Sequence, residues 1–192
     1  NYRSTIESTP INIKPSNSYL LFTVNNYIAE EKSKTVNILD FGGACGAHYF
    51  ECRPFIPTGV SVKWFVLETE SMVKSAREHR LGNEELVFIS SFDQLNDKID
   101  IIHSSSTIQY VPEPYKALEL LMDLDAPFLV FNRMMFVDDD HDMITVQKTR
   151  LMNNGPGPLP YGYNDKEISY PHTTISYRKF LECLGKNYTE AY

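Results

Sequence analysis

An acidic residue followed by closely spaced glycines is the segment of this sequence best suited to bind a ligand. Asp40 ends a short apolar run at positions 36–39, and small residues follow at Gly42, Ala44 and Gly46. Such residues let the backbone pass close to a ligand, and the N–H groups at the start of the next helix would point at an anionic group. The segment therefore predicts a cofactor-binding loop after a buried strand.

The glycine spacing does not fit a dinucleotide-binding loop. A dinucleotide-binding loop would require glycine at the positions of Phe41, Gly43 and Gly46, and Phe41 breaks that pattern. Glu68 ends the second predicted strand, where a carboxylate can accept both hydroxyls of a ribose. The alternatives are a tight turn without a ligand for the glycine segment and a solvated loop acid for Glu68.

The elements that would position these residues alternate between strands and helices. Short apolar runs predict buried strands at 36–39, 62–67, 86–90, 99–103 and 128–131. Apolar residues three and four apart, or amphipathic stretches with capping residues, predict helices at 16–31, 70–81, 112–124 and 176–184. Strands separated by helices form βαβ units, so we predict an α/β fold: a doubly wound, mostly parallel, Rossmann-like sheet with helices on both faces.

The two ends of the chain are expected to differ from this regular middle. Residues 1–15 are predicted to form an N-terminal arm and residues 16–192 one domain, with a β-like run at 143–148 and an irregular loop at 153–163. Residues 186–192 resemble the start of a further strand. We therefore expect a domain that is incomplete at its C-terminus, within a product longer than this sequence, which does not begin with Met.

Composition limits the classes of protein that fit. A chain of 192 residues with 42% hydrophobic residues can build one core, and its formal charge of −7 argues against a binder of nucleic-acid phosphates. Three cysteines do not form a disulfide framework. No apolar run is long enough to cross a membrane and no signal peptide is visible, so we expect a cytoplasmic location. The oligomeric state stays open.

Several segments together resemble a known enzyme family. The segment Asp40 to Gly46 resembles the first motif of class I methyltransferases that use S-adenosylmethionine. The segments 48–50, 63–68, 104–110, 132–133, 145–147 and 169–171 extend the resemblance to a family of bacterial methyltransferases associated with surface-polysaccharide gene clusters. The likeness covers roughly residues 35–185. The chain departs from it at Met134–Met135 and at His172–Thr173, which concern the acceptor pocket and leave the fold unchanged.

The resemblance implies that S-adenosyl-L-methionine is the cofactor. The residues it assigns are Asp40, Phe41, Gly42, Gly43 and Gly46 around the methionine part, Glu68 at the ribose, Thr69, Ser91 and Phe92 at the adenine, and Ser104, Ser105 and Gln109 beside the sulfonium and acceptor. A plain core aromatic is the alternative for Phe92.

Methyl transfer from a sulfonium is an in-line displacement, which requires alignment more than acid–base chemistry. Where the acceptor must lose a proton, a histidine would serve, and His48 and His172 are the catalytic candidates. Packing or capping is the alternative for both. His103 is expected in the core and His79 in solvent.

These residues predict a methyltransferase that acts on an oxygen or nitrogen of a small acceptor, such as a sugar or polysaccharide precursor. One alternative is a catalytically silent protein that binds the cofactor and acts through a partner. A nucleotide-sugar or NAD-dependent enzyme is a third, which Phe41 disfavours. The acidic run at 138–142 lacks the spacing of a calcium loop, so we expect it to be a solvated loop and the site to use no metal.

Overall fold

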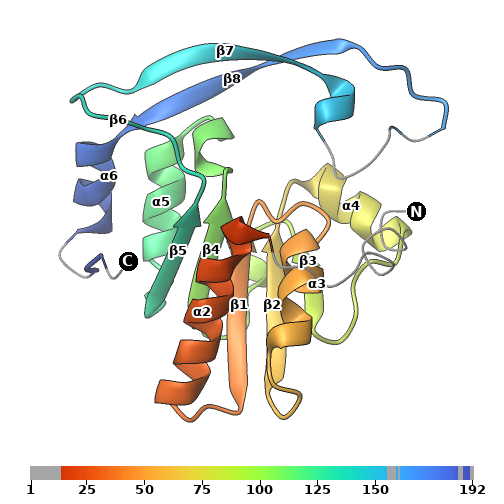
Figure 1. The fold of residues 1–192 in the computed structure, drawn as a ribbon, viewed down its shortest axis with the longest axis vertical. Coiled ribbons are helices and arrows are strands. Elements are labelled where there is room, and N and C mark those ends of the chain that lie inside the picture. Colours follow the sequence, from red (N-terminus) through yellow and green to blue (C-terminus); the bar gives the residue numbers. More distant parts are fainter. Residues whose placement is uncertain (1–13, 155–158, 160, 186–187, 191–192) are drawn as a thin grey trace.

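The computed structural model describes residues 14–154, 159, 161–185 and 188–190. Its centre is a parallel sheet of five strands in the order β3-β2-β1-β4-β5 (Figure 1). The strands are β1 (Thr35–Phe41), β2 (Ser61–Leu67), β3 (Leu86–Ile89), β4 (Ile101–Ser105) and β5 (Phe128–Asn132). The helices are α2 (Pro15–Glu30), α3 (Ala47–Cys52), α4 (Glu70–Glu78), α5 (Pro114–Met122) and α6 (Tyr177–Leu184), with single 3₁₀ turns η1 (Arg53–Phe55), η2 (Phe92–Gln94), η3 (Ile108–Tyr110) and η4 (Leu151–Asn153). The α/β prediction is confirmed.

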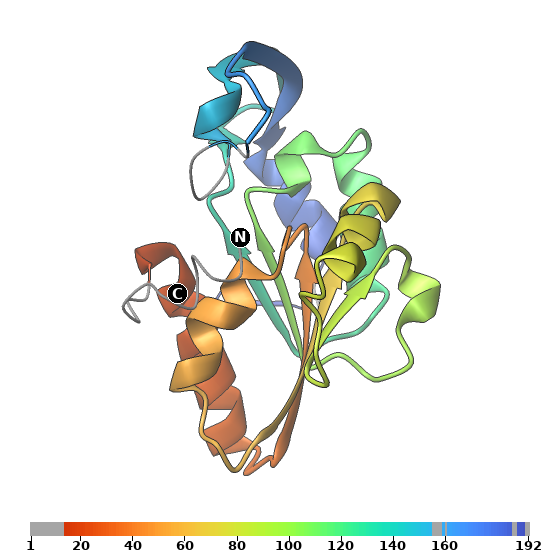
Figure 2. The same ribbon diagram turned by 90° about the vertical axis from the view of Figure 1, so that its right-hand side faces the viewer.

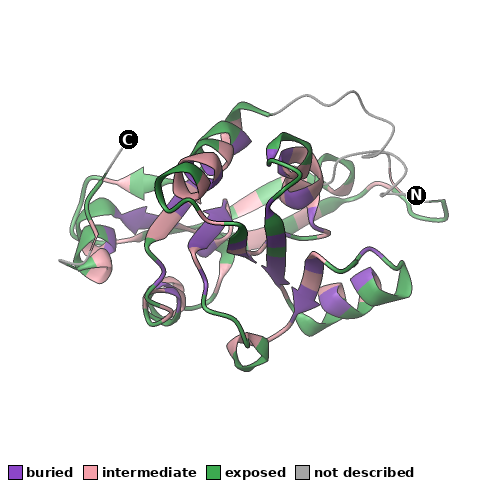
Figure 3. Cartoon of the chain, turned by 90° about the horizontal axis from the view of Figure 1, so that it is seen from below, coloured by how far each residue is buried: buried purple, intermediate pink, exposed green. Residues whose placement is uncertain are grey.

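Alternate residues of each strand face opposite layers of helices. In β2, Trp64 and Val66 join the apolar cluster that includes α2 and α3, whereas Phe65 and Leu67 join the cluster of α5 and α6. Figure 2 shows these two pairs of helices on opposite sides of the sheet, and Figure 3 shows that burial is concentrated on the strands and on the helix faces turned toward them. Because both faces are covered, the strands are almost continuously apolar, as their sequences indicated.

A second, smaller sheet lies across the carboxyl ends of the first (Figure 1). Its strands are β6 (Phe136–Val137), β7 (Met143–Arg150) and β8 (Glu167–Ser176), in the order β6-β8-β7. The sequence predicted β7 as a β-like run but did not predict β8. β7 and β8 pair antiparallel along their whole common length and form a long two-stranded ribbon.

Some predicted boundaries differ from the structure. β4 begins and ends two residues later than predicted, because Ser104 and Ser105 still pair with β5. The predicted arm falls on residues 1–13, outside the described residues, except for Lys14 and Pro15, and Pro15 already begins α2. Of the strand expected at 186–192, residues 188–190 have no regular structure and the rest lies outside the described residues.

In the part of the chain that the structure describes, no helix has the length and apolarity needed to span a bilayer.

Helix α5 offers a paired test of the core. Leu118 is completely buried, while Leu120 on the same helix is 41% exposed. We expect Leu118→Ala to lower the free energy of unfolding by about 2–5 kcal/mol, because it removes buried methyl groups and leaves a cavity. Leu120→Ala should change it by no more than about 0.5 kcal/mol. Urea unfolding followed by circular dichroism measures both, and equal effects would contradict this assignment of the core.

Candidate functional site

A cavity of about 400 Å³ opens at the carboxyl ends of β1, β2, β3 and β4. Its lining residues come from the last residues of β1 and β2 and from the loops that follow the four strands: Phe41, Gly42, Leu67, Glu68, Thr69, Ser90, Ser91, Phe92, Ser106, Thr107, Tyr110 and Val111. Six of the twelve were predicted from sequence as cofactor-binding residues. In open α/β sheets this edge is where ligands bind.

Glu68 joins two of these loops through its carboxylate. One oxygen accepts a hydrogen bond from the backbone N–H of Ala44 at 3.1 Å, and the other accepts from the N–H of Thr69 at 3.0 Å. Ala44 has a left-handed backbone with φ of 51°, so this bond holds the glycine loop in a strained conformation. Each carboxylate oxygen keeps a lone pair for a further donor, and Glu68 lines the cavity.

The glycines have two distinct structural roles. Gly42 has φ of 73°, and a Cβ there would lie 2.2 Å from the hydroxyl oxygen of Thr107, so this position keeps the loop close to the segment after β4. Gly43 is buried, and a Cβ there would lie 2.4 Å from a carboxylate oxygen of Asp40. Gly42 therefore shapes the cavity wall, whereas Gly43 makes room for the Asp40 side chain.

The carboxylate of Asp40 has no exposed surface and is bound by three ring nitrogens. His48 Nδ1 lies 2.9 Å from one oxygen, and His103 Nδ1 lies 3.0 Å from the other. Trp64 Nε1 donates to the first oxygen at 3.3 Å. Asp40 thus reaches the helix after the glycine loop and both neighbouring strands. Its predicted contact with the methionine part of a cofactor stays a prediction, since the carboxylate does not line the cavity.

Asp40, His48 and His103 differ in the direction in which their pKa values are shifted. Burial alone would raise the pKa of Asp40, but His48 and the hydrogen bonds from both histidines outweigh it, and the pKa lies well below its ordinary range. Burial also acts to lower the pKa of His48, and the Asp40 charge and hydrogen bond instead raise it above its ordinary value. For His103, burial prevails and the pKa is lowered. The group is therefore an Asp40–His48 ion pair beside a neutral His103.

Asn132 determines the tautomer of that neutral histidine. Its Nδ2 donates to the backbone oxygen of Ser16 at 2.7 Å and lies 3.2 Å from His103 Nε2. The amide nitrogen can donate to both, so Nε2 accepts and the proton of His103 is on Nδ1, where it meets Asp40. His103 was predicted as a core residue, and its role in positioning Asp40 was not predicted.

The same three side chains have the chemistry of metal ligands, since one ligand atom from each of Asp40, His48 and His103 lies within 4.8 Å of the others. Their N···O distances of 2.9 and 3.0 Å are those of direct hydrogen bonds. The prediction of a site that uses no metal is not tested by this geometry.

Three predicted residues lie behind the cavity wall instead of on it. Ser104, Ser105 and Gln109 are buried and absent from its lining. β4 runs two residues further than predicted, so the exposed loop begins at Ser106, which has φ of 59°. Ser106 and Thr107 take the wall positions. A prediction that placed the end of β4 correctly would have found them.

His172, the second catalytic candidate, lies on β8 and contacts a residue of the cavity wall without lining the cavity itself. It is 2% exposed, and its Nε2 has no hydrogen-bond partner among the described residues. Its ring packs edge-to-face on Tyr110 at 5.2 Å, and Tyr110 lines the cavity. The hydroxyl of Tyr110 also donates to Gln147 of β7 at 3.1 Å. β8 was not predicted, so the approach of His172 to the cavity could not be derived from sequence.

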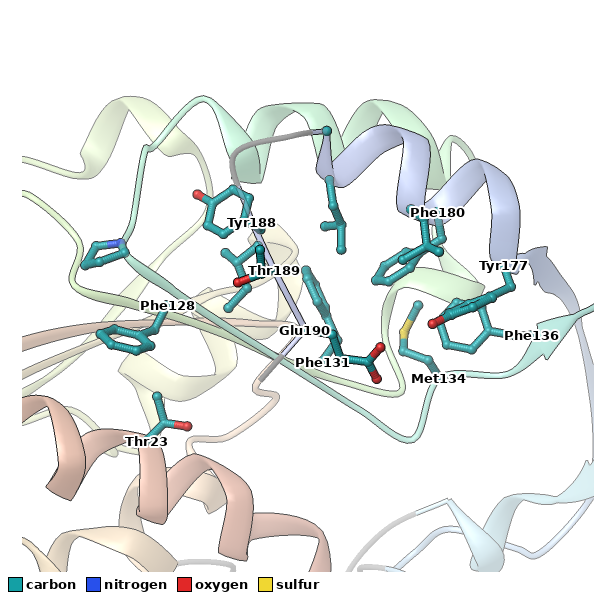
Figure 4. A pocket seen from close by; sticks show the side chains of 15 residues that line it. Thr23, Phe128, Phe131, Met134, Phe136, Tyr177, Phe180, Tyr188, Thr189 and Glu190 are labelled. Atoms are coloured by element: carbon teal, nitrogen blue, oxygen red, sulfur yellow. The ribbon is translucent and has the colours of Figure 1, made fainter. Parts of the chain in front are cut away.

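A second cavity, of about 550 Å³, lies beside β5 and α6. Figure 4 shows its aromatic wall, where Phe180 packs on Phe131 at 5.5 Å and on Phe136 at 4.9 Å. None of the predicted site residues lines it. It is an apolar hollow at the outer edge of the sheet and is separate from the candidate site.

Comparison with solved structures places this arrangement in a known fold. CalS10, an amino pentose methyltransferase from Micromonospora echinaspora, is similar over 94% of this chain and 84% of its own, with 16% identity and a TM-score of 0.57. The sugar N-methyltransferase KedS8 from Streptoalloteichus sp. is similar over 90% of this chain and 79% of its own, with 13% identity and a TM-score of 0.55. An S-adenosylmethionine-dependent methyltransferase from Clostridium acetobutylicum is similar over 97% of this chain and 84% of its own, with 11% identity and a TM-score of 0.54.

No family model matches the sequence, and no curated protein matches it. At these identities the likeness concerns the fold, which is the Rossmann-like fold of class I methyltransferases.

The ion pair predicts how His48 titrates. In the wild-type protein its midpoint should lie above the ordinary value of 6.5. In Asp40→Asn the charge is lost while the burial remains, so the midpoint should fall below that value. Histidine-selective NMR across a pH series measures both. An unchanged midpoint in Asp40→Asn would show that Asp40 does not hold the charge of His48.

Unfolding gives an independent check of the same pair. A raised pKa of His48 means that its contribution to stability is complete below pH 6.5 and is lost as the pH rises through the raised value. Asp40 contributes above its ordinary pKa and loses its contribution only in strong acid. The stability difference between wild type and His48→Gln should therefore be larger near pH 6 than near pH 9.

Proposed function

We propose that this protein is an S-adenosylmethionine-dependent methyltransferase that methylates an oxygen or nitrogen of a small acceptor. The observation that carries the proposal is the cavity at the carboxyl ends of β1 to β4, with Glu68 on its wall and bonded to the glycine loop. The fold shared with methyltransferases supports it.

The described residues fit the proposed cofactor. Glu68 lies at a strand end with lone pairs free to accept two ribose hydroxyls, and Phe92 and Ser91 line the same cavity, where an aromatic face and a hydroxyl suit an adenine. Gly42 leaves the wall open beside Thr107. When bound, the cofactor supplies a methyl group on a positively charged sulfur.

The protein's own contribution would be alignment and exclusion of water. Tyr110 lines the cavity and is held by ring contacts with Tyr170 and His172 and by its bond to Gln147, so the ribbon is fixed against one wall. An acceptor bound beside Tyr110 would lie next to the cofactor cavity.

The two candidate histidines suit different tasks. A protonated His48 carries a hydrogen on each ring nitrogen, so it cannot take up a proton and is suited to hold negative charge. His172 has a buried Nε2 without a partner in the part of the chain that the structure describes, which makes it our candidate for contact with the acceptor's reacting group and for removal of its proton.

A sugar is the acceptor class we propose. CalS10 is described as an amino pentose methyltransferase and KedS8 as a sugar N-methyltransferase, and the sequence resemblance points to polysaccharide gene clusters. The chain departs from that resemblance at Met134–Met135 and at His172–Thr173; Met134 lines the second cavity, whereas His172 contacts Tyr110 of the candidate site. A cofactor-binding protein without activity is the second candidate, and release of S-adenosylhomocysteine with sugar or amine acceptors separates the two.

Cofactor binding can be tested with a conservative change at Glu68. We expect isothermal titration calorimetry to show binding of S-adenosylhomocysteine and not of NADH. Glu68→Gln should weaken that binding by roughly tenfold or more, because hydrogen bonds to a charged group are lost. Glu84→Gln, at an exposed acid away from the cavity lining, is the matched control and should bind as wild type does.

Two results would refute this assignment. Binding of neither ligand by the wild-type protein would remove the cofactor proposal, and full affinity in both Glu68→Ala and Asp40→Ala would remove the site.

His172 is tested on the acceptor side. His172→Gln should lower kcat/KM for an active sugar or amine acceptor by roughly a hundredfold, the lower range of general-base effects, while leaving the affinity for S-adenosylhomocysteine unchanged. A dependence of the rate on pH that disappears in the variant would support proton removal by His172. Equal losses of activity and cofactor affinity would instead show a structural role.

A further inference from the structure

We propose that the free edge of β7 pairs antiparallel with β7 of a second copy of this chain about a two-fold axis. The proposal concerns the outer side of the ribbon and stands independently of the function proposed above.

β7 is an edge strand whose first half, residues 143–146, carries no charge. It spans eight residues, and among the strands of the described chain only β8 pairs with it. In Figure 1 it is the outermost strand of the ribbon, away from the main sheet. Such an edge presents unpaired N–H and C=O groups that a further strand can bind.

The middle of β7 is also apolar and uncovered. Ile144 is 75% exposed and Val146 is 67% exposed, and alternate residues of a strand share a face. Met143 on the other face is 52% exposed. Proteins usually place a charge or a proline within such an edge. In β7 the charges, Lys148 and Arg150, lie in the second half, and the segment 143–146 has neither a charge nor a proline.

Charges are separated along the edge and favour a second copy over another partner. The acidic run 138–142 leads into β7, and Lys148 and Arg150 lie at its far end. An antiparallel two-fold pairing places the acidic end of each copy opposite the basic end of the other. A parallel pairing would set like charges together.

The intramolecular partners of the two cations do not neutralise this edge. Lys148 lies 3.9 Å from Glu167 with both side chains mostly exposed, and Arg150 binds Asp165 at 2.7 Å. Glu167 lies on β8, one strand further from the free edge, and Asp165 precedes β8. Lys148 and Arg150 therefore stay exposed to an incoming strand. In the acidic run, Asp140 forms an ion pair with Arg178 of α6 in which both side chains stay mostly exposed, and Asp142 accepts hydrogen bonds from Tyr115 and from the backbone N–H of Ser176.

Pairing at β7 would extend the ribbon into a continuous sheet shared by two chains. The opposite side of each ribbon carries His172 and Tyr170, which contact Tyr110 at the cavity. A dimer would brace both ribbons at the position where they meet the candidate site.

The first test measures the mass of the full chain by sedimentation velocity over a range of concentrations. The wild-type protein should form a dimer, and Ile144→Glu with Val146→Glu should weaken dimerisation by roughly tenfold or more. Leu120→Glu changes a 41% exposed residue on α5 and should leave the dimer intact. Urea midpoints close to wild type would show that the variants still fold.

A charge exchange tests the orientation of the strands. One variant carries Lys148→Glu and Arg150→Glu, and the other carries Asp138→Lys, Asp139→Lys and Asp140→Lys, which changes the run 138–142 from four negative charges to a net charge of +2. The urea midpoint of the second variant checks that it still folds without the ion pair between Asp140 and Arg178. In the proposed pairing each variant alone opposes like charges and should be largely monomeric, whereas an equimolar mixture opposes unlike charges and should recover the dimer.

Three outcomes would overturn the proposal: a monomeric wild-type protein at all concentrations, a dimer that the β7 variants do not weaken, or mixed variants that stay monomeric. A dimer that persists in the β7 variants would mean that another surface pairs the chains.

Discussion

The ionised carboxylate of Asp40 lies without exposed surface in the middle of the fold. Removing such a charge from water costs several kcal/mol unless partners replace the lost hydration. Here the partners are His48 of α3, His103 of β4 and Trp64 of β2. Since each comes from a different element, the position of α3 and the alignment of three strands are fixed by the same charge.

The hydrogen bonds continue beyond this carboxylate across the sheet. Trp64, Asp40, His103 and Asn132 lie on β2, β1, β4 and β5, which is the order of these strands in the sheet, and Asn132 then binds Ser16 O at the start of α2. Asp40 and Asn132 lie at or next to the carboxyl ends of β1 and β5, and Trp64 and His103 lie in the middle of β2 and β4. The loops that line the cavity therefore begin from positions that polar contacts hold rigidly.

Rigid starting points allow backbone conformations that would otherwise be unfavourable. Ala44, Ser106 and Arg133 follow β1, β4 and β5, and all three have positive φ, from 51° to 59°. Such residues cost of order 1–3 kcal/mol each and persist only where the surroundings impose them. Three further described residues with positive φ, Lys32, Arg80 and Asp125, lie away from the carboxyl ends of the strands, so backbone strain is shared between this edge and other turns.

Local patterns were enough to predict the strands of the main sheet and most of its helices, because buried parallel strands and amphipathic helices have distinct periods. The glycine loop and Glu68 could be found for the same reason, since motif spacing is local. The partners of Asp40 could not: they lie 8, 24 and 63 residues away and meet only through the strand order.

Strand β8 shows a second limit of local reasoning. Pro171 in its middle disfavours a central strand, since proline cannot donate a hydrogen bond. The structure accommodates it because β6 pairs only with Ile175 and Ser176, so β8 has one open edge at Pro171. Because Pro171 argues against a strand here, the sequence did not predict β8, and the contact of His172 with Tyr110 could not be predicted either.

Trp64 is the only tryptophan in the chain, and its indole N–H is bonded to the carboxylate of Asp40. Indole emission responds to nearby charge and to the polarity around the ring. All intrinsic tryptophan fluorescence of this protein therefore originates beside the Asp40–His48 ion pair. The molecule carries its own optical reporter of the electrostatic state of its centre, without any added label.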